Sequence, residues 1–190
     1  EQALKMTNLL DNHDVPRFLF DFPDVRRLRA ALVYALTFDG IPCIYYGTEQ
    51  DFDGGPDPSN REDMWHSGFK TDGATFRHMQ ALIRLRKALT PLRRGDVTWR
   101  WASPRNGQES DAGLMAFERA AGDERVLVVI NSHAERAARS TFEGTTMQTG
   151  FPGGTVLVDR LNGDETFTVS ADGTLDLTTD PLTGRVLVPQ

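Results

Sequence analysis

The fold of this chain is decided by the stretch Asn8-Leu9-Leu10-Asp11-Asn12-His13-Asp14-Val15-Pro16-Arg17. An apolar run that starts at Met6 ends there in a polar cluster, which predicts a short strand over Met6–Leu10 followed by a loop. A parallel β/α barrel presents its working side chains where its strands end, at the C-terminal rim. We therefore predict that His13 and Asp14 stand side by side at the end of a strand.

The residues up to about 92 alternate between strand and helix patterns. Apolar residues at steps of three and four predict a helix over Asp24–Asp39, closed by Gly40 and Pro42. The continuous apolar run Ile41–Tyr46 predicts a strand that is buried on both faces, and a polar loop rich in Gly and Pro follows it. A second amphipathic helix is predicted over Ala74–Leu89. This order of elements is typical of a parallel α/β unit.

From Gly95 onward the apolar residues recur with a period of two. Asn162-Gly163 and Asp172-Gly173 are dipeptides that favour hairpin turns. Short strands at this spacing predict an antiparallel β-sandwich. The predicted strands are Val97–Trp101, Leu114–Glu118, Val126–Asn131, Val156–Leu161, Thr166–Val169, Thr174–Leu177 and Arg185–Val188.

Composition narrows the possible partners. The 190 residues include 21 Lys and Arg against 27 Asp and Glu, a net charge of −6, which argues against nucleic acid as a partner. No apolar run approaches eighteen residues, so we expect no membrane span. The single cysteine, Cys43, lies in an apolar run and is expected to be a buried core residue. The chain begins at Glu1 with no recognisable targeting segment, so its cellular compartment stays undetermined.

Two motifs resemble those of the α-amylase superfamily, glycoside hydrolase family 13. Asn12-His13-Asp14 is similar to the motif at the end of the family's seventh barrel strand, and the stretch from Gly40 to Gln50 is similar to its eighth-strand motif. The resemblance implies an α/β plus all-β fold. Residues 1–92 would be the last two strand–helix units of a (β/α)8 catalytic barrel, and residues 93–190 an antiparallel β-sandwich, domain C.

The resemblance also implies roles for the first motif. Asp14 would be the carboxylate that stabilises the transition state by gripping sugar hydroxyls, and His13 would hydrogen-bond the same sugar. The nucleophile and the acid/base would lie on earlier strands, so we expect this chain alone to be inactive. Its implied partners are an α-1,4-linked glucan or maltooligosaccharide and the missing N-terminal barrel portion. The alternatives are an α-glucan transglycosylase of the same family, a non-catalytic carbohydrate-binding module and a purely structural domain.

The loop Asp51–Glu62 places carboxylates where a calcium-binding EF-hand loop has them. The position that requires Gly is Pro56, and no helix-loop-helix frame is predicted, so we reject that interpretation. The loop resembles instead the Asp-Pro-x-Asn-Arg stretch of cyclodextrin glucanotransferases and related α-amylases. This implies that Asp57 and Arg61 bind a glucose unit near the cleaved bond; the alternative is a loop salt bridge. No cofactor is evident, and calcium could be held in a complete enzyme by residues outside this chain.

Several further residues carry expectations of their own. Arg17 is expected to be a charge at the rim that pairs with Asp11 or Asp21, while Asp11 and Asn12 support the loop. Glu49 is expected to be a hydrogen-bonded structural residue rather than the proton donor. The tryptophans could be sugar-stacking platforms, but Trp99 and Trp101 alternate on one strand and are expected to face the core together. The third tryptophan is Trp65, and Tyr45 and Tyr46 are interpreted as packing residues.

Overall fold

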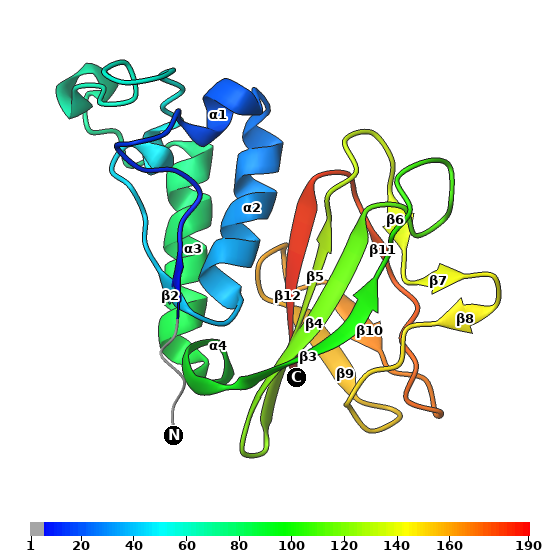
Figure 1. Ribbon diagram of the computed structural model, residues 1–190. Coiled ribbons are helices and arrows are strands. Elements are labelled where there is room, and N and C mark those ends of the chain that lie inside the picture. Colours follow the sequence, from blue (N-terminus) through cyan, green and yellow to red (C-terminus); the bar gives the residue numbers. More distant parts are fainter. Residues whose placement is uncertain (1–5) are drawn as a thin grey trace.

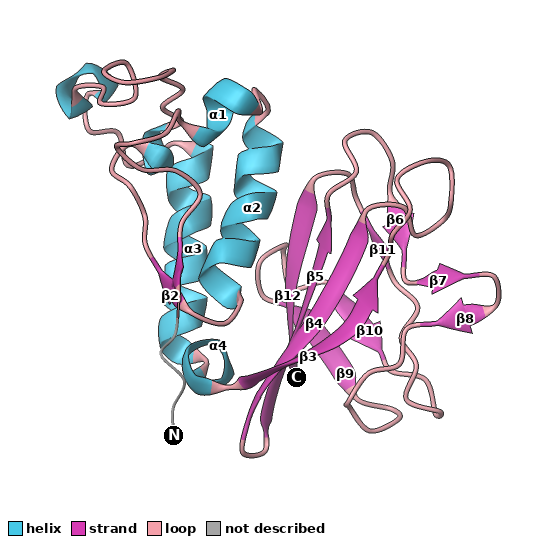
Figure 2. Cartoon of the chain, viewed as in Figure 1, coloured by secondary structure: helices cyan, strands magenta, loops and turns pink. Residues whose placement is uncertain are grey.

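The computed structural model describes residues 6–190 and divides into helices beside a β-sheet (Figure 1). The N-terminal part is α/β, and everything after residue 95 is built from strands and loops (Figure 2). Among the described residues, no helix is both long and apolar enough to cross a membrane. The first part contains β1 (Thr7–Asn8), α1 (Phe18–Asp21), α2 (Val25–Thr37), β2 (Ile41–Pro42), the 3-10 helices η1 (Thr48–Gln50) and η2 (Met64–Ser67), α3 (Ala74–Ala88) and α4 (Thr90–Arg94).

The strands β1 and β2 run parallel, with α2 between them in sequence. Thr7 pairs with Ile41, and the Cys43 amide continues the ladder by donating to the Asn8 carbonyl at 2.8 Å. Both strands are shorter than predicted. The prediction of a strand buried on both faces is wrong, as is that of a buried Cys43: Ile41 is 57% exposed and Cys43 is exposed. Among the described residues, β1 and β2 pair only with each other. Both are therefore edge strands, and part of their side-chain surface is exposed to solvent.

The helix α2 begins and ends close to its predicted limits. Asp24 is its N-cap, because its side chain accepts a hydrogen bond from the Arg26 amide. The residues Leu28, Leu32 and Leu36 follow one another at steps of four and are all buried, which explains why this segment is helical. At the other end Gly40 takes a φ of +117°, and a Cβ there would lie 2.6 Å from the Met6 carbonyl oxygen.

The β part is organised around a six-stranded antiparallel sheet in the order β10-β9-β12-β5-β4-β3. Six of the seven predicted strands are present. The seventh, Thr174–Leu177, is not a strand: Thr174 makes an isolated bridge to Gln148, and the strand β11 starts only at Thr178. The sheet strands are β3 (Asp96–Ala102), β4 (Leu114–Ala121), β5 (Glu124–Asn131), β9 (Val156–Asp159), β10 (Thr166–Thr168) and β12 (Thr183–Pro189).

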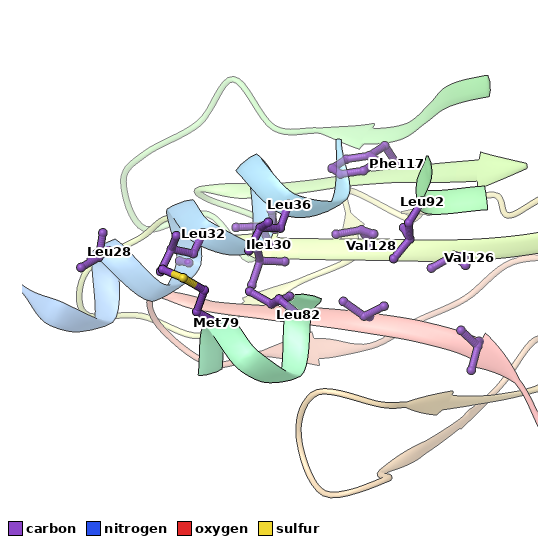
Figure 3. Packing of buried hydrophobic residues seen from close by; sticks show 14 of the residues in the cluster. Leu28, Leu32, Leu36, Met79, Leu82, Leu92, Phe117, Val126, Val128 and Ile130 are labelled. Atoms are coloured by element: carbon purple, nitrogen blue, oxygen red, sulfur yellow. The ribbon is translucent and has the colours of Figure 1, made fainter. Parts of the chain in front are cut away.

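Two apolar clusters cover the two faces of this sheet. The face toward α2, α3 and α4 forms the first (Figure 3). Gly184 on β12 lies there, and a Cβ at that position would be 2.7 Å from Val33, so α2 approaches the strand closely. The opposite face packs against the segment that carries two short strand pairs, β6 (Ala138–Arg139) with β11 (Thr178–Thr179) and β7 (Thr141–Phe142) with β8 (Thr145–Thr146). The first cluster includes Leu28, Leu32, Leu36, Met79, Leu82, Leu92, Phe117, Val126, Val128 and Ile130.

The two tryptophans of β3 do not share a face, which corrects the prediction that they face the core together. The pairing of β3 with β4 shifts between Trp99 and Trp101, as a β-bulge does. Trp99 pairs with Phe117 on the helix side and is 49% exposed. Trp101 turns to the other cluster, where its indole N–H donates to Asp111 at 3.1 Å. One extra residue therefore reverses the alternation on which the prediction depended.

Two arginines hold the C-terminal end of α2. Arg119, from β4, is fully buried and donates to the carbonyls of Thr37 and Gly95, both at 2.7 Å. Arg86, from α3, donates to the carbonyls of Leu36, Leu92 and Gly40 at 2.6–2.9 Å. Burial lowers the pKa of both guanidinium groups, which nonetheless stay charged because arginine titrates far above neutral pH. The Leu36 and Thr37 carbonyls at the end of α2, which have no partner within the helix, are thereby satisfied.

We expect Arg119→Met to lower the free energy of unfolding by about 3 kcal/mol, because it keeps the aliphatic stem and leaves buried carbonyls without a donor. Urea denaturation of the chain measures this change. The control is Arg160→Met, which removes an exposed ion pair to Asp164 and should change stability by less than about 1 kcal/mol. Equal losses in the two variants would contradict the role given to Arg119.

Candidate functional site

The candidate site lies where the loops that follow β1 and β2 meet (Figure 1). Parallel strands end at the same edge of a sheet, so the two loops are brought together by the pairing of β1 with β2. His13 and Asp14 stand at this edge with side chains that are 62% and 71% exposed. Their Nε2 and Oδ1 atoms are 3.3 Å apart. The prediction that these two side chains stand together is confirmed.

The backbone under this pair is fixed by buried or local hydrogen bonds. Asp11 is 4% exposed and accepts from the Phe18 amide at 3.0 Å and from the Thr48 hydroxyl at 3.2 Å. The Asn12 side chain accepts from the Asp14 amide at 2.7 Å. The supporting role predicted for Asp11 and Asn12 is confirmed by these contacts.

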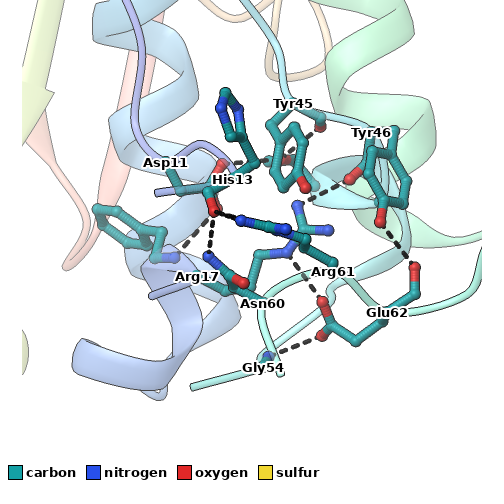
Figure 4. Close-up of polar contacts among 12 residues, drawn as sticks. Asp11, His13, Arg17, Tyr45, Tyr46, Gly54, Asn60, Arg61 and Glu62 are labelled. Atoms are coloured by element: carbon teal, nitrogen blue, oxygen red, sulfur yellow. Dashed lines mark hydrogen bonds and ion pairs between the residues drawn. The ribbon is translucent and has the colours of Figure 1, made fainter. Parts of the chain in front are cut away.

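Asn60 joins the second loop to the first (Figure 4). It is fully buried, and its Nδ2 donates to the carbonyls of His13 at 3.0 Å and of Val15 at 2.8 Å. The neighbouring Arg61 also points at the His13 carbonyl, at 3.3–3.4 Å. Sequence analysis assigned Asn60 no role of its own, although it stands beside Arg61 in the motif. It holds the His13 backbone from the loop that carries the second pair of predicted sugar-binding residues.

Arg17 is fully buried, so the prediction of an exposed charge paired with Asp11 or Asp21 is wrong. Its Nε donates to Glu62 at 2.9 Å and its Nη1 to the Tyr46 carbonyl at 2.7 Å. Its guanidinium carbon lies 4.1 Å from the centre of the Tyr45 ring. The loop after β2 folds over Arg17, and sequence spacing alone gives no indication of that.

Glu62 is a second residue that sequence analysis missed. One of its oxygens accepts from Arg17, and the other accepts from the Gly54 amide at 2.7 Å. Its backbone carbonyl accepts from the Tyr46 hydroxyl at 2.9 Å. The carboxylate therefore joins Gly54 of the second loop to the buried Arg17, and no pattern in the sequence marks Glu62 for this role.

Tyr45 separates the buried Arg17 from the exposed His13. Its ring centre is 6.4 Å from that of His13 and 4.6 Å from that of Tyr46. Desolvation raises the pKa of the Tyr45 hydroxyl, with a smaller contribution from its hydrogen bond with Tyr46. The phenol, like an ordinary tyrosine, is neutral at physiological pH and can serve as a hydrogen-bonding group beside His13.

Asp57 and Arg61 form an ion pair at the same rim, with Oδ1 and Nη2 3.0 Å apart. Their side chains are 56% and 49% exposed, so both groups remain accessible to a ligand. Glu49, by contrast, accepts from the Gly47 amide at 3.0 Å, which confirms that it is hydrogen-bonded within its own turn. Among residues 6–190, no group of three or more His, Cys, Asp or Glu side chains is arranged to hold a metal ion.

Comparison with known proteins places this chain beside α-amylases and cyclomaltodextrin glucanotransferases. Residues 105–190 match the family described as "Alpha amylase, C-terminal all-beta domain". The chain is 35% identical over 179 residues to cyclomaltodextrin glucanotransferase from Geobacillus stearothermophilus, covering 93% of this chain and 23% of that protein. It is 31% identical over 173 residues to α-amylase 2 from Schwanniomyces occidentalis, covering 87% and 32%. The chain thus spans about a quarter to a third of the length of these relatives.

Solved structures agree with the sequence comparison. An α-amylase from Geobacillus thermoleovorans, complexed with acarbose, superposes with a TM-score of 0.79 at 28% identity, covering 98% of this chain and 39% of that one. The cyclomaltodextrin glucanotransferase CldA, described as having a three-domain ABC distribution, gives a TM-score of 0.81 at 28% identity, covering 100% and 38%. The predicted succession of an α/β segment and an antiparallel β domain is therefore confirmed, while the division at residues 92 and 93 stays a prediction.

We expect Arg17→Met to loosen the two loops, because Glu62 and the Tyr46 carbonyl lose their buried donor. The amides of the segments 11–20 and 47–62 should exchange with solvent roughly 10- to 100-fold faster, as local opening becomes easier by about 1.4–2.8 kcal/mol. Hydrogen exchange followed by mass spectrometry measures this. The matched control is Arg61→Met, an exposed cation from the same loop, for which protection of these segments should change little. Unchanged exchange in Arg17→Met would show that packing alone holds the loops.

Proposed function

This chain belongs to the α-amylase family, glycoside hydrolase family 13, as part of its C-terminal region, and on that basis we propose that it completes the active site of a retaining α-glucan-acting enzyme. Asp14 supplies the carboxylate that stabilises the transition state, and His13 binds the same sugar. The nucleophile and the acid/base come from a barrel portion outside this chain, which is also its structural partner. The chain by itself is inactive.

The observation that carries this proposal is the contrast between a fixed backbone and exposed side chains at His13 and Asp14. Buried Asp11 and Asn60 hold the loop, yet both functional side chains are more than half exposed. An active site needs its groups held in place before the substrate arrives, and buried supporting contacts provide that.

The chemistry of the pair suits glycoside cleavage. The transition state has the character of an oxocarbenium ion, so a carboxylate nearby lowers its energy. Asp14 lies 3.3 Å from the His13 ring, and the imidazole can donate to a sugar hydroxyl while the carboxylate accepts from another. Neither residue needs to form a covalent bond in this scheme. Covalent chemistry would be done by the acid/base and the nucleophile of the barrel portion.

The second pair extends the proposed site toward a longer substrate. Asp57 and Arg61 are exposed, ion-paired and linked to His13 through the Arg61 contact with its backbone carbonyl. A carboxylate accepts hydrogen bonds from sugar hydroxyls, and a guanidinium donates them in a fixed planar geometry. We therefore assign this pair to a glucose unit of a maltooligosaccharide outside the cleavage position.

Transfer to a sugar acceptor is the second candidate activity. The similarity to cyclomaltodextrin glucanotransferases favours it, since one of them is 35% identical over most of this chain. The same carboxylate would stabilise the transition state in either reaction, because hydrolysis and transfer differ in the acceptor that attacks the glycosyl-enzyme. The product pattern from maltoheptaose separates the two: shorter linear sugars indicate hydrolysis, whereas cyclic or longer products indicate transfer.

In the complete enzyme, Asp14→Asn should reduce kcat on soluble starch at least ~100-fold, because it keeps the size of the side chain and removes the charge that opposes the developing cation. Steady-state kinetics with soluble starch measure the loss. The control is Asp21→Asn, which changes an exposed carboxylate on α1 and should leave kcat within about twofold. Near wild-type turnover in Asp14→Asn would exclude this assignment.

The variants Asp57→Ala and Arg61→Ala should weaken the binding of long maltooligosaccharides by about 1–3 kcal/mol, the scale of polar groups left unpaired. Hydrolysis of short aryl glycosides should change less, since these do not reach the pair. Comparison of KM for maltoheptaose with that for a short aryl maltoside tests the assignment. A similar loss on both substrates would indicate that the ion pair serves only to stabilise its loop.

A further inference from the structure

Two large aromatic side chains are exposed in the loop that carries the Asp57–Arg61 pair. Trp65 in η2 is 67% exposed, and Phe69 just after it is 64% exposed. Tryptophan buries most of its surface in ordinary folded positions, so two exposed aromatic rings within five residues are an unusual feature of the surface of residues 6–190. The other exposed tryptophan, Trp99, packs against Phe38 and Phe117 beside the sheet and so has a structural explanation.

The backbone that carries these rings is held in a defined turn. The Ser67 hydroxyl donates to the Met64 carbonyl at 2.6 Å and accepts from the Phe69 amide at 3.0 Å. The Gln50 side chain donates to the Lys70 carbonyl at 2.9 Å, which fastens the far end of the loop to η1. Phe69 has a φ of +53°, a conformation that is unfavourable for a side chain of this kind. The rings are therefore presented outward by a fixed turn.

The position of the turn relates it to the candidate site. In Figure 1 the loop with η2 projects at the same end of the α/β part as the loop that follows β1. It continues directly from Arg61 and Glu62, and the latter is anchored to buried Arg17. The aromatic rings thus follow the Asp57–Arg61 pair along the chain within the same loop.

The chemistry of such a surface fits a glucan. The C–H bonds of a glucose ring form apolar faces that lie flat on an aromatic ring, while its hydroxyl groups at the edge stay available for hydrogen bonds. Aromatic side chains offer a large apolar area of defined shape, which rewards this contact by excluding water. Paired Asp57 and Arg61 would bind the edge of one sugar, and a ring farther along the loop would bind the face of another.

We propose that Trp65, assisted by Phe69, is a stacking platform for a glucose unit of a long α-glucan, beyond the unit bound by Asp57 and Arg61. This inference rests on the proposed function, because it requires that the rim bind an α-glucan. It adds a determinant of chain length: substrates long enough to reach Trp65 gain affinity, and shorter ones do not.

The test is the comparison of Trp65→Ala with the wild type in the complete enzyme. The KM for maltoheptaose and soluble starch should rise about tenfold, whereas kcat and the kinetics on a short aryl maltoside should stay within about twofold. Trp65→Tyr should restore most of the affinity, because it keeps an aromatic face. The control, Trp99→Ala, removes an exposed tryptophan that is not at the rim and should leave the ratio of long-substrate to short-substrate KM unchanged.

Tryptophan fluorescence gives a second measurement of binding, one that can be made on the wild-type enzyme. Maltoheptaose should protect part of the tryptophan fluorescence from acrylamide quenching, maltose should not, and the protected fraction should be absent in Trp65→Phe. Equal losses on long and short substrates in Trp65→Ala, or no protection by maltoheptaose, would overturn the platform and indicate that a neighbouring segment of the enzyme covers Trp65. The proposed function fails separately, by retained turnover in Asp14→Asn.

Discussion

The burial of the C-terminal end of α2 is the constraint on which the rest of this structure depends. A helix end leaves carbonyl oxygens without partners, and here that end lies between the α/β part and the sheet, away from water. Arg86 from α3 donates to the carbonyls of residues 36 and 40. Arg119 from β4 donates to the carbonyl of residue 37. The start of β2 is thereby fixed in space, and with it the loop that follows. The same two guanidinium groups bind the carbonyls of Leu92 and Gly95, so the connection into the sheet is fixed by the same contacts.

The candidate site repeats this arrangement on a smaller scale. Arg17 is fully buried, and like Arg86 and Arg119 it satisfies groups of a segment distant in sequence, here Glu62 and the Tyr46 carbonyl. The side chains with which we associate function, above all His13 and Asp14, make few contacts of their own. Under our proposal, stability and function fall to different residues of the same loops: the buried ones hold the backbone, and the exposed ones are left accessible to a ligand. Such a division lets the backbone stay fixed while the side chains at the rim remain accessible.

Local patterns in the sequence predicted the elements whose structure is decided locally. The leucines of α2 recur at steps of four, and both long helices were predicted to within about two residues at each end. The position of His13 and Asp14 after a strand could be predicted from the point where an apolar run ends. The misses depend on contacts between distant segments. Burial of Arg17 requires the loop after β2, which lies about 30 to 45 residues later, to fold over it, and no pattern in the sequence around Arg17 indicates this. The exposure of Ile41 depends on how many strands flank β2, which is a property of the sheet and not of the sequence of the strand.

The bulge in β3 has an optical consequence. Because it turns Trp99 and Trp101 to opposite faces, the three tryptophans occupy three unlike surroundings: a solvent-facing turn, the seam between helices and sheet, and the far cluster where the indole is bonded to a carboxylate. Indole emission responds to polarity and to nearby charge, so variants that keep one tryptophan at a time would give three independent signals from one molecule. The rate of unfolding of the helix-facing layer, reported by Trp99, could then be compared with that of the other layer, reported by Trp101. Trp65 in the exposed turn would serve as the reference signal.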